Sequence, residues 1–219
     1  MQIEPIAFFR SPLKEKFGTP RQAGIAPGLP GTVEFCKGFE PAMLDGLEGF
    51  DYLWIIWGFS LNNPNAASSA KVRPPRLGGN EKMGVYATRS PYRPNPLGLS
   101  SVRIHAVDAA AGRIEVLGAD LVDGTPIFDI KPYLEYADAH TGIRSGFAAE
   151  APGGKLRVVF EDMPFAVSEP LRRQLCEILS QDPRPAYHDD PERIYGLNFD
   201  GRNVRFKVEG DTLIVLEIS

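Results

Sequence analysis

The chain has 219 residues, of which 43% are hydrophobic and 24% charged, and its formal net charge is −4. This composition is typical of globular proteins, and the length suits one domain or one domain with a small appendage. No run approaches the ~18 apolar residues of a membrane-spanning helix. The N-terminus lacks the basic and apolar regions of a signal peptide, and Cys36 and Cys176 suggest no disulfide framework. We therefore expect a cytoplasmic protein with no membrane segment.

Positive charge is concentrated in two segments of this acidic chain. The stretch 71–103 holds seven basic residues and one acid, and the stretch 10–22 holds four basic residues and one acid. A basic face on an acidic body can bind a polyanion such as nucleic acid locally. Taken alone, the charge pattern is explained more simply by two solvated loops.

The first half of the chain predicts short strands. Expected strands cover 3–9, 32–35, 52–59, 83–88, 101–107, 113–121 and 127–130, with one helical turn over 41–45. The most apolar segment, 52–59, is rich in aromatic and branched residues, which favours a strand buried on both faces. Val102, Ile104 and Ala106 alternate with polar residues, as in a half-buried antiparallel strand. Strands without intervening helices predict a mainly β barrel or sandwich.

The last third of the chain predicts a small α+β domain. The small-residue stretch 145–154 is the best linker candidate, which divides the chain into domains over 1–147 and 148–219. Beyond it we expect a strand over 156–160 and a helix from Glu169 to about Leu179, with Ser168 as its N-cap. Three short strands should follow, near 195, over 204–208 and over 213–218, with a turn at 210–211 between the last two.

Several common catalytic signatures are missing. There is no Gly-x-Gly-x-x-Gly motif, no Walker lysine and no Gly-x-Ser-x-Gly motif. The three histidines, His105, His140 and His188, have no paired metal-ligand spacing, so we expect no metal site.

Two segments carry unusual residue combinations. Segments 72–80 and 84–100 combine arginines with prolines, which can pre-position guanidinium groups for an anion because proline lowers the entropy lost on ordering. The alternative is a rigid surface loop with solvated arginines. In segment 120–133, Asp123-Gly124 is a good hairpin turn, or it presents backbone N–H groups and a carboxylate to a ligand.

These two segments, together with 10–12, 20–22 and 181–187, resemble motifs of the TsaA-like family, and most closely its bacterial tRNA methyltransferases. The likeness runs from Ile6 almost to the C-terminus. It implies a single antiparallel β-barrel that uses S-adenosyl-L-methionine and works as a homodimer. The implied substrate is threonylcarbamoyladenosine next to the anticodon of tRNA, with the methyl group going to the exocyclic adenine nitrogen.

The resemblance also implies particular cofactor contacts. They fall at Pro20, Arg21, Gln22, Ser60, Leu61, Arg89, Leu99, Val122, Asp123, Gly124 and Thr125. Some relatives have His-Gln where this chain has Ser60-Leu61, so only backbone or hydroxyl contacts could remain there.

Methyl transfer needs in-line alignment and removal of a proton from a poorly nucleophilic nitrogen. Asp123 and Asp129 are candidate bases, although each could be structural and the base could be water or absent. Arg93 and Lys131 are candidates for binding the threonine carboxylate. Arg184 and Tyr187 could grip the anticodon loop by phosphate contact and stacking, or could simply form a helix stop with a packed tyrosine.

Two rival functions remain open at this point. One is a methyltransferase of the same fold that acts on another nucleoside or a small molecule. The other is a non-catalytic S-adenosylmethionine-binding regulator of RNA. A regulator should bind the cofactor without turnover, whereas an enzyme should produce S-adenosylhomocysteine only with its acceptor.

Overall fold

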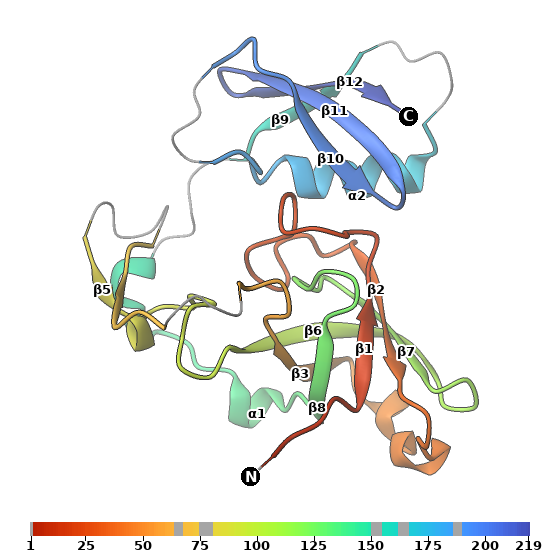
Figure 1. Cartoon of the computed structure of the whole chain (residues 1–219). Coiled ribbons are helices and arrows are strands. Elements are labelled where there is room, and N and C mark those ends of the chain that lie inside the picture. The colour runs from red at the N-terminus through yellow and green to blue at the C-terminus, as the bar shows by residue number, and fades with distance from the viewer. Residues whose placement is uncertain (1, 64–67, 75–80, 150–154, 162–166, 186–189) are drawn as a thin grey trace.

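The structure is a computed structural model that describes residues 2–63, 68–74, 81–149, 155–161, 167–185 and 190–219. The chain forms a closed β-barrel followed by a four-stranded sheet with one long helix (Figure 1). The prediction of a mainly β protein with an antiparallel barrel and a small α+β part is confirmed.

Six strands close the barrel in the order β1–β2–β7–β6–β3–β8, and each is antiparallel to both neighbours. The strands are β1 (Ala7–Arg10), β2 (Pro30–Phe35), β3 (Tyr52–Gly58), β6 (Leu97–Asp108), β7 (Arg113–Leu117) and β8 (Pro126–Pro132). Leu53 and Ile55 of β3 are fully buried in the barrel interior, whereas Tyr52 is exposed. The prediction that 52–59 is buried on both faces is therefore wrong, because a strand of this closed barrel fully buries only its inner face.

A β-bulge interrupts the expected alternation in β6. Its pairing with β7 shifts register between Ile104 and Ala106, so His105 is the inserted residue. Beyond the bulge, Ala106 is exposed and Val107 packs against the barrel core. The expectation of an inward-facing Ala106 is wrong because a single inserted residue exchanges the two faces of a strand.

Short elements fill the connections of the barrel. They are η1 (Pro41–Leu44), η2 (Leu47–Gly49), β4 (Lys71–Val72), β5 (Met83–Gly84), η3 (Val85–Ala87), α1 (Glu135–Asp138) and η4 (Gly146–Ala148). The helical turn predicted over 41–45 is confirmed as the 3-10 helix η1. The strand expected over 83–88 is only the two-residue β5, which pairs with β4 and leads directly into η3.

The C-terminal sheet has the strand order β10–β11–β12–β9, with β9 parallel to β12 and the other pairs antiparallel. The elements are β9 (Arg157–Phe160), α2 (Glu169–Leu179), β10 (Tyr195–Phe199), β11 (Arg202–Glu209) and β12 (Thr212–Ile218). The helix has the predicted bounds, and Leu175, Ile178 and Leu179 are buried. Ser168 is at the N-cap, but its side chain makes no capping hydrogen bond.

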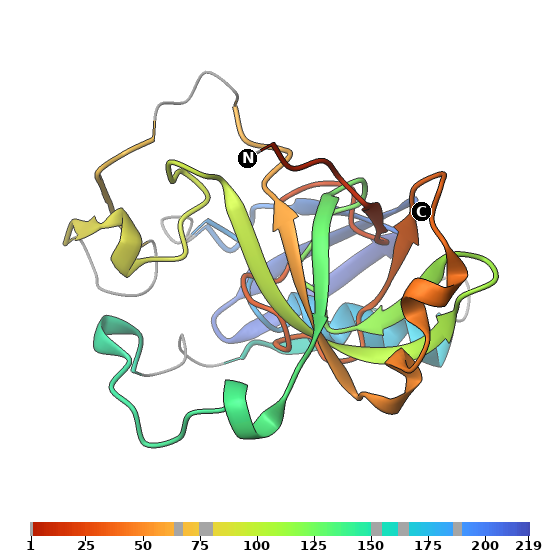
Figure 2. The same cartoon turned by 90° about the horizontal axis from the view of Figure 1, so that it is seen from below.

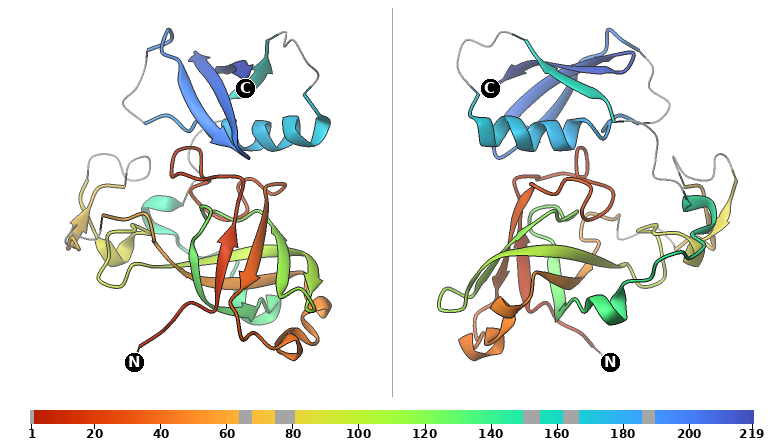
Figure 3. Two further views of the ribbon diagram at one scale, coloured as in Figure 1. Left: turned by 45° about the vertical axis from the view of Figure 1, so that its right-hand side comes forward. Right: turned by 180° about the vertical axis from the view of Figure 1, so that it is seen from behind.

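The long loop 11–29 after β1 contributes to the core of the C-terminal sheet. Leu13, Ala26 and Leu29 are buried in one cluster with residues of α2 and β10–β12. Leu13 forms a β-bridge with Phe199. Figure 3 shows this loop lying directly below α2. The division at residues 147 and 148 stays a prediction, and the two parts share apolar packing through this loop.

Candidate functional site

One rim of the barrel gathers most of the segments for which the resemblance implies cofactor contacts. Strands β1, β3 and β7 end at this rim, and β2, β6 and β8 begin there, because neighbouring strands are antiparallel. The loop 11–29, the residues after Gly58 and the loop 118–125 therefore meet at one end of the barrel. Figures 1 and 3 show α2 lying over the same end.

The Asp123 turn is fastened to the chain that leaves β1. The Asp123 carboxylate accepts hydrogen bonds from the Ser11 backbone N–H at 3.0 Å and from Lys14 Nζ at 2.8 Å. The backbone N–H groups of Asp123 and Gly124 donate to the carbonyls of Leu13 and Phe9, both at 2.8 Å. This network fixes the turn 122–125 against the start of loop 11–29.

The surroundings of Asp123 favour its ionised form. Partial burial acts to raise the pKa of the carboxyl, but the hydrogen bonds from Lys14 and Ser11 and the nearby charges of Lys14 and Arg10 outweigh it. The pKa of Asp123 is therefore lower than that of an ordinary aspartate, which makes the carboxylate a weaker proton acceptor.

Loop 11–29 also contacts the segments around Ser60 and Arg89. The Arg89 guanidinium donates a hydrogen bond to the Gln22 side-chain carbonyl. Asn62 links the same parts of the chain, because its carbonyl accepts from Lys16 Nζ at 3.3 Å and its amide donates to the Pro91 carbonyl at 3.0 Å. Segments that are far apart in the sequence thus converge at this rim.

A buried polar chain that the sequence analysis missed runs below this convergence. The Trp57 indole N–H donates to Ser100 Oγ at 2.9 Å, and Ser100 Oγ donates to the Asp120 carboxylate at 2.5 Å. Burial raises the pKa of Asp120, whereas the Ser100 hydrogen bond and the Arg89 charge act to lower it. Asp120 was visible in the 120–133 motif, but only its folded surroundings show that it lies near Arg89.

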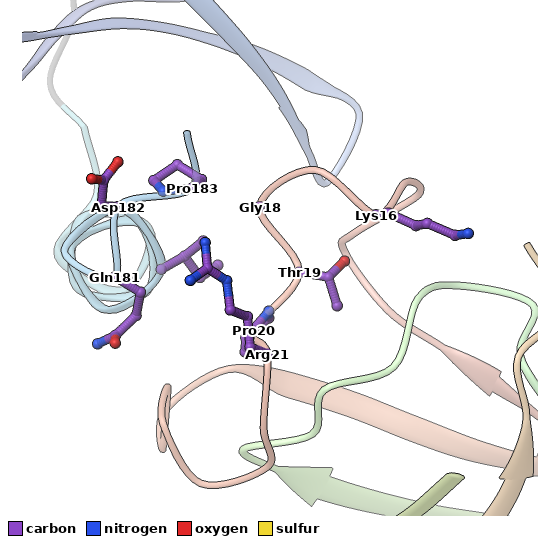
Figure 4. Close-up of a pocket in the computed structure, with 9 residues that line it drawn as sticks. Lys16, Gly18, Thr19, Pro20, Arg21, Gln181, Asp182 and Pro183 are labelled. Carbon is purple, nitrogen blue, oxygen red and sulfur yellow. The ribbon is translucent and has the colours of Figure 1, made fainter. Parts of the chain in front are cut away.

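A small cavity separates loop 11–29 from the end of α2. Its volume is about 120 Å³, and it is lined by residues 16 and 18–21 on one side and by Ile178 and 181–183 on the other. Figure 4 shows the Arg21 side chain extending toward the end of α2, whereas Lys16 points away. The cavity is smaller than the ~300 Å³ at which ligand pockets usually begin. The two neighbouring side chains thus differ in direction: Arg21 extends toward the C-terminal part, whereas Gln22 contacts Arg89.

Another group of predicted residues lies on the outer face of the barrel. Ile56 of β3 is the cross-strand partner of Leu99 on one side and of Asp129 on the other, so these three side chains share a face. Leu99 is 58% exposed. Lys131 follows on the same strand as Asp129, and the two form an ion pair at 3.2 Å.

The predicted tRNA residues are placed very differently from one another. Arg93 donates to the Thr88 carbonyl at 3.3 Å and lies over the Tyr86 ring. Arg184 has an 11% exposed side chain that forms a two-pronged ion pair with Asp182. This geometry supports the alternative in which Arg184 stabilises the helix stop. Tyr187 lies outside the described residues.

Two other features are absent from the described residues: a metal-ligating cluster and a membrane-spanning helix. Across the ranges given above, no group of three or more His, Cys, Asp or Glu side chains is arranged to hold a metal ion. Within those same ranges, no helix is long and apolar enough to cross a membrane.

Comparison with known proteins identifies the family. Residues 8–139 match the tRNA-methyltransferase O N-terminal domain, and residues 158–219 match the TrmO C-terminal domain. The chain belongs to the TrmO family. A tRNA (adenine(37)-N6)-methyltransferase of Escherichia coli K12 is 40% identical over 219 residues, covering 94% of this chain and 93% of that protein.

Two further similarities extend over the whole chain. One relative is RcsF of Pseudomonas aeruginosa, which is named as a provisional S-adenosylmethionine-dependent methyltransferase. It is 38% identical to this chain, and the match covers 99% of this chain and 97% of RcsF. The crystal structure of TrmO from Pseudomonas aeruginosa superposes with a TM-score of 0.81 at 31% identity, covering 100% of this chain and 98% of that one. Both parts of this TrmO-family chain, including the C-terminal sheet, therefore have counterparts.

Proposed function

We propose that this chain transfers a methyl group from S-adenosyl-L-methionine to N6 of adenine 37 in tRNA, and that this adenosine carries the threonylcarbamoyl group. The observation that carries the proposal is the convergence of the family's motif segments at one barrel rim, where Gln22 meets Arg89 and the Asp123 turn meets loop 11–29. The full-length similarity to a tRNA (adenine(37)-N6)-methyltransferase supports the choice of substrate. A tRNA substrate also supports the expected cytoplasmic location.

The residues at the rim fit the chemistry of the cofactor. Arg89 supplies a cation for the methionine carboxylate. Leu61 after β3 and Leu99 on the adjoining outer face, 46% and 58% exposed, supply apolar surface for the adenine ring. Gly124 has a φ of +74°, and a Cβ atom there would meet nothing within 4 Å, so the space beside this turn is open to a ligand. When bound, S-adenosylmethionine supplies a methyl group already activated by its sulfonium.

The chain's own residues would bind and orient the acceptor. Arg93 and Lys131 are the cations proposed for the threonine carboxylate, one on the arginine-proline loop and one on β8. Between the two candidate bases we favour Asp129: Asp123 is held by Ser11 and Lys14 and has a lowered pKa, whereas Asp129 pairs with the exposed Lys131 and accepts a local backbone N–H. Asp129 shares its face with Leu99. A water molecule taking the proton remains the alternative to test.

A homodimer would cover the apolar outer face of the barrel. Leu97 and Leu99 are large apolar side chains exposed near the start of β6, and Leu99 is the cross-strand partner of Ile56 on β3. Contiguous exposed apolar side chains of this kind mark protein interfaces. Sedimentation of the wild type and of Leu99→Glu tests this arrangement, because the substitution should shift a dimer toward monomer. An unchanged dimer would place the interface elsewhere.

The function is tested by methyl transfer from labelled S-adenosylmethionine to two tRNA pools. One pool carries threonylcarbamoyladenosine, and the other comes from cells unable to make it. Label in the first pool only is the expected result. Label in both pools would keep the methyltransferase and reject the modified acceptor. Cofactor binding with label in neither pool would favour the non-catalytic regulator or a small-molecule methyltransferase.

A further inference from the structure

A cavity of about 410 Å³ lies in the arginine-proline loop pair. Its walls come from 68–70 on one side and from 84–87 with Pro94 on the other. Figures 1 and 2 show this segment, which includes β5, projecting from the side of the barrel. The volume falls within the ~300–1,000 Å³ typical of small-ligand pockets.

Backbone pairing holds the two walls in place. Lys71 of β4 pairs with Gly84 of β5, and the Val85 N–H donates to the Ala70 carbonyl at 3.0 Å. Most of the lining residues are small, since Ser, Ala and Gly provide much of the surface. A Cβ atom at Gly84 would meet nothing within 4 Å, so the space directly beside the backbone is open.

One aromatic ring stands at this cavity with an unusual degree of exposure. Tyr86 lines the cavity and is 75% exposed. The Arg93 guanidinium lies 6.0 Å from the centre of its ring and also donates to the Thr88 carbonyl at 3.3 Å. This contact restrains the ring from one side. An exposed, restrained aromatic ring is a surface on which a nucleic-acid base stacks.

The charged residues around the cavity are mostly basic, which favours a nucleic-acid partner. Lys71, Lys82, Arg89 and Arg93 lie within the two segments that form or flank the walls, against Glu81 as the acid among the described residues there. Such a balance attracts the phosphates of a nucleic-acid strand. The walls themselves are small and largely uncharged, which suits a flat base rather than a phosphate.

We propose that this cavity receives an unstacked base of the tRNA anticodon loop other than the methylated adenine, stacked on Tyr86. The proposal rests on the proposed function, because it assumes that the loop is bound for methyl transfer at the barrel. It adds a recognition subsite beside the paired strands β4 and β5. Through this subsite, the identity and conformation of a neighbouring nucleotide influence which RNA is methylated.

Three full-length variants and a matched control probe the subsite. Tyr86→Ala removes the stacking surface, Tyr86→Phe keeps it, and Gly84→Leu adds a bulky side chain at the cavity wall, where a Cβ atom meets nothing within 4 Å. Tyr136→Ala is the control, since Tyr136 is a tyrosine 88% exposed at another place. The probes are anticodon stem-loop RNAs carrying threonylcarbamoyladenosine, one intact and the others each with one loop base removed.

Loss of one stacked base typically weakens binding by roughly 5- to 150-fold. We expect Tyr86→Ala and Gly84→Leu to raise the Kd and KM for the intact RNA by that factor, with unchanged Kd for S-adenosylmethionine. Tyr86→Phe and Tyr136→Ala should behave as the wild type. Removal of one particular base should weaken wild-type binding, yet add no further loss in Tyr86→Ala.

Two results would overturn the subsite in distinguishable ways. In the first, the wild type binds and methylates the RNA, but Tyr86→Ala and Gly84→Leu do so equally well, or every base removal weakens binding by Tyr86→Ala as much as it weakens binding by the wild type. The cavity then holds no base, and the proposed function stands. If the wild type neither binds nor methylates the RNA, the proposed function and the subsite fail together.

Discussion

Replacement of Asp123 tests whether its carboxylate fastens the turn 122–125 to the start of loop 11–29. In Asp123→Ala, the Ser11 N–H loses its acceptor, and the Lys14 hydrogen bond is lost as well. A hydrogen bond to a charged group contributes about 1.5–3 kcal/mol, and an ion pair with an exposed lysine adds about 0.2–1 kcal/mol. We therefore expect a loss of about 2–4 kcal/mol in the free energy of unfolding at pH 7.

Asp123→Asn separates the two contributions. Its side-chain carbonyl can still accept from Ser11, so the expected loss is about 1 kcal/mol. The pKa of Asp123 is lowered on folding, so the stabilisation by the charge is present above the unfolded-state pKa of about 3.9 and is lost as pH falls through the folded-state pKa. The difference between wild type and Asp123→Asn should shrink over that acidic range.

Urea unfolding at pH 7 and at several lower pH values measures these differences. Asp129→Asn is the matched control, since its partner Lys131 is exposed and the change should stay within about 0.5 kcal/mol. Equal losses in Asp123→Ala and Asp123→Asn would refute the role of the Ser11 hydrogen bond. A difference that stays constant with pH would refute the role of the charge.

Three further predictions follow from the site. Gly98→Ala should lower the free energy of unfolding by about 1–3 kcal/mol in urea titration, because its Cβ would overlap the Trp57 indole, and wild-type stability would contradict that packing. Burial raises the pKa of Asp120, so the wild type should lose stability relative to Asp120→Asn as the pH rises from about 3.9 through the folded-state pKa. Thermal unfolding of both proteins at pH 4 and pH 7 measures this difference. A gain in wild-type stability relative to Asp120→Asn over that range would contradict the prediction. Arg93→Ala should raise the Kd for modified tRNA more than that for S-adenosylmethionine in direct binding assays, and equal losses would remove its substrate role.

Local signals in the sequence were enough for the C-terminal helix and for the strand-rich barrel. The helix α2 has its predicted bounds: Ser168 stands at the N-cap position without a capping hydrogen bond, Pro170 lies in the first turn, and an apolar stripe defines the buried face. The bulge at His105 was not predictable, because an inserted residue depends on pairing with a distant strand. The burial of Leu13 in the core of the C-terminal sheet was not predictable either, because it depends on tertiary packing.

The resemblance marked the segments that hold the expected site residues, but not the contacts that each side chain makes. The contact between Gln22 and Arg89 joins two segments that the resemblance had marked. The commitment of Asp123 to Ser11 and Lys14, and of Arg184 to Asp182, emerged only from the folded chain. Sequence shows that a charged residue is present, whereas its partners decide whether it is available to a ligand.

The most direct test of the central claim is nucleoside analysis of tRNA after incubation with the wild-type chain and S-adenosylmethionine. Threonylcarbamoyladenosine from position 37 should gain one methyl group on N6, and tRNA lacking that modification should be unchanged. Cofactor binding without any methylated nucleoside, or methylation at a different nucleoside, would contradict the account.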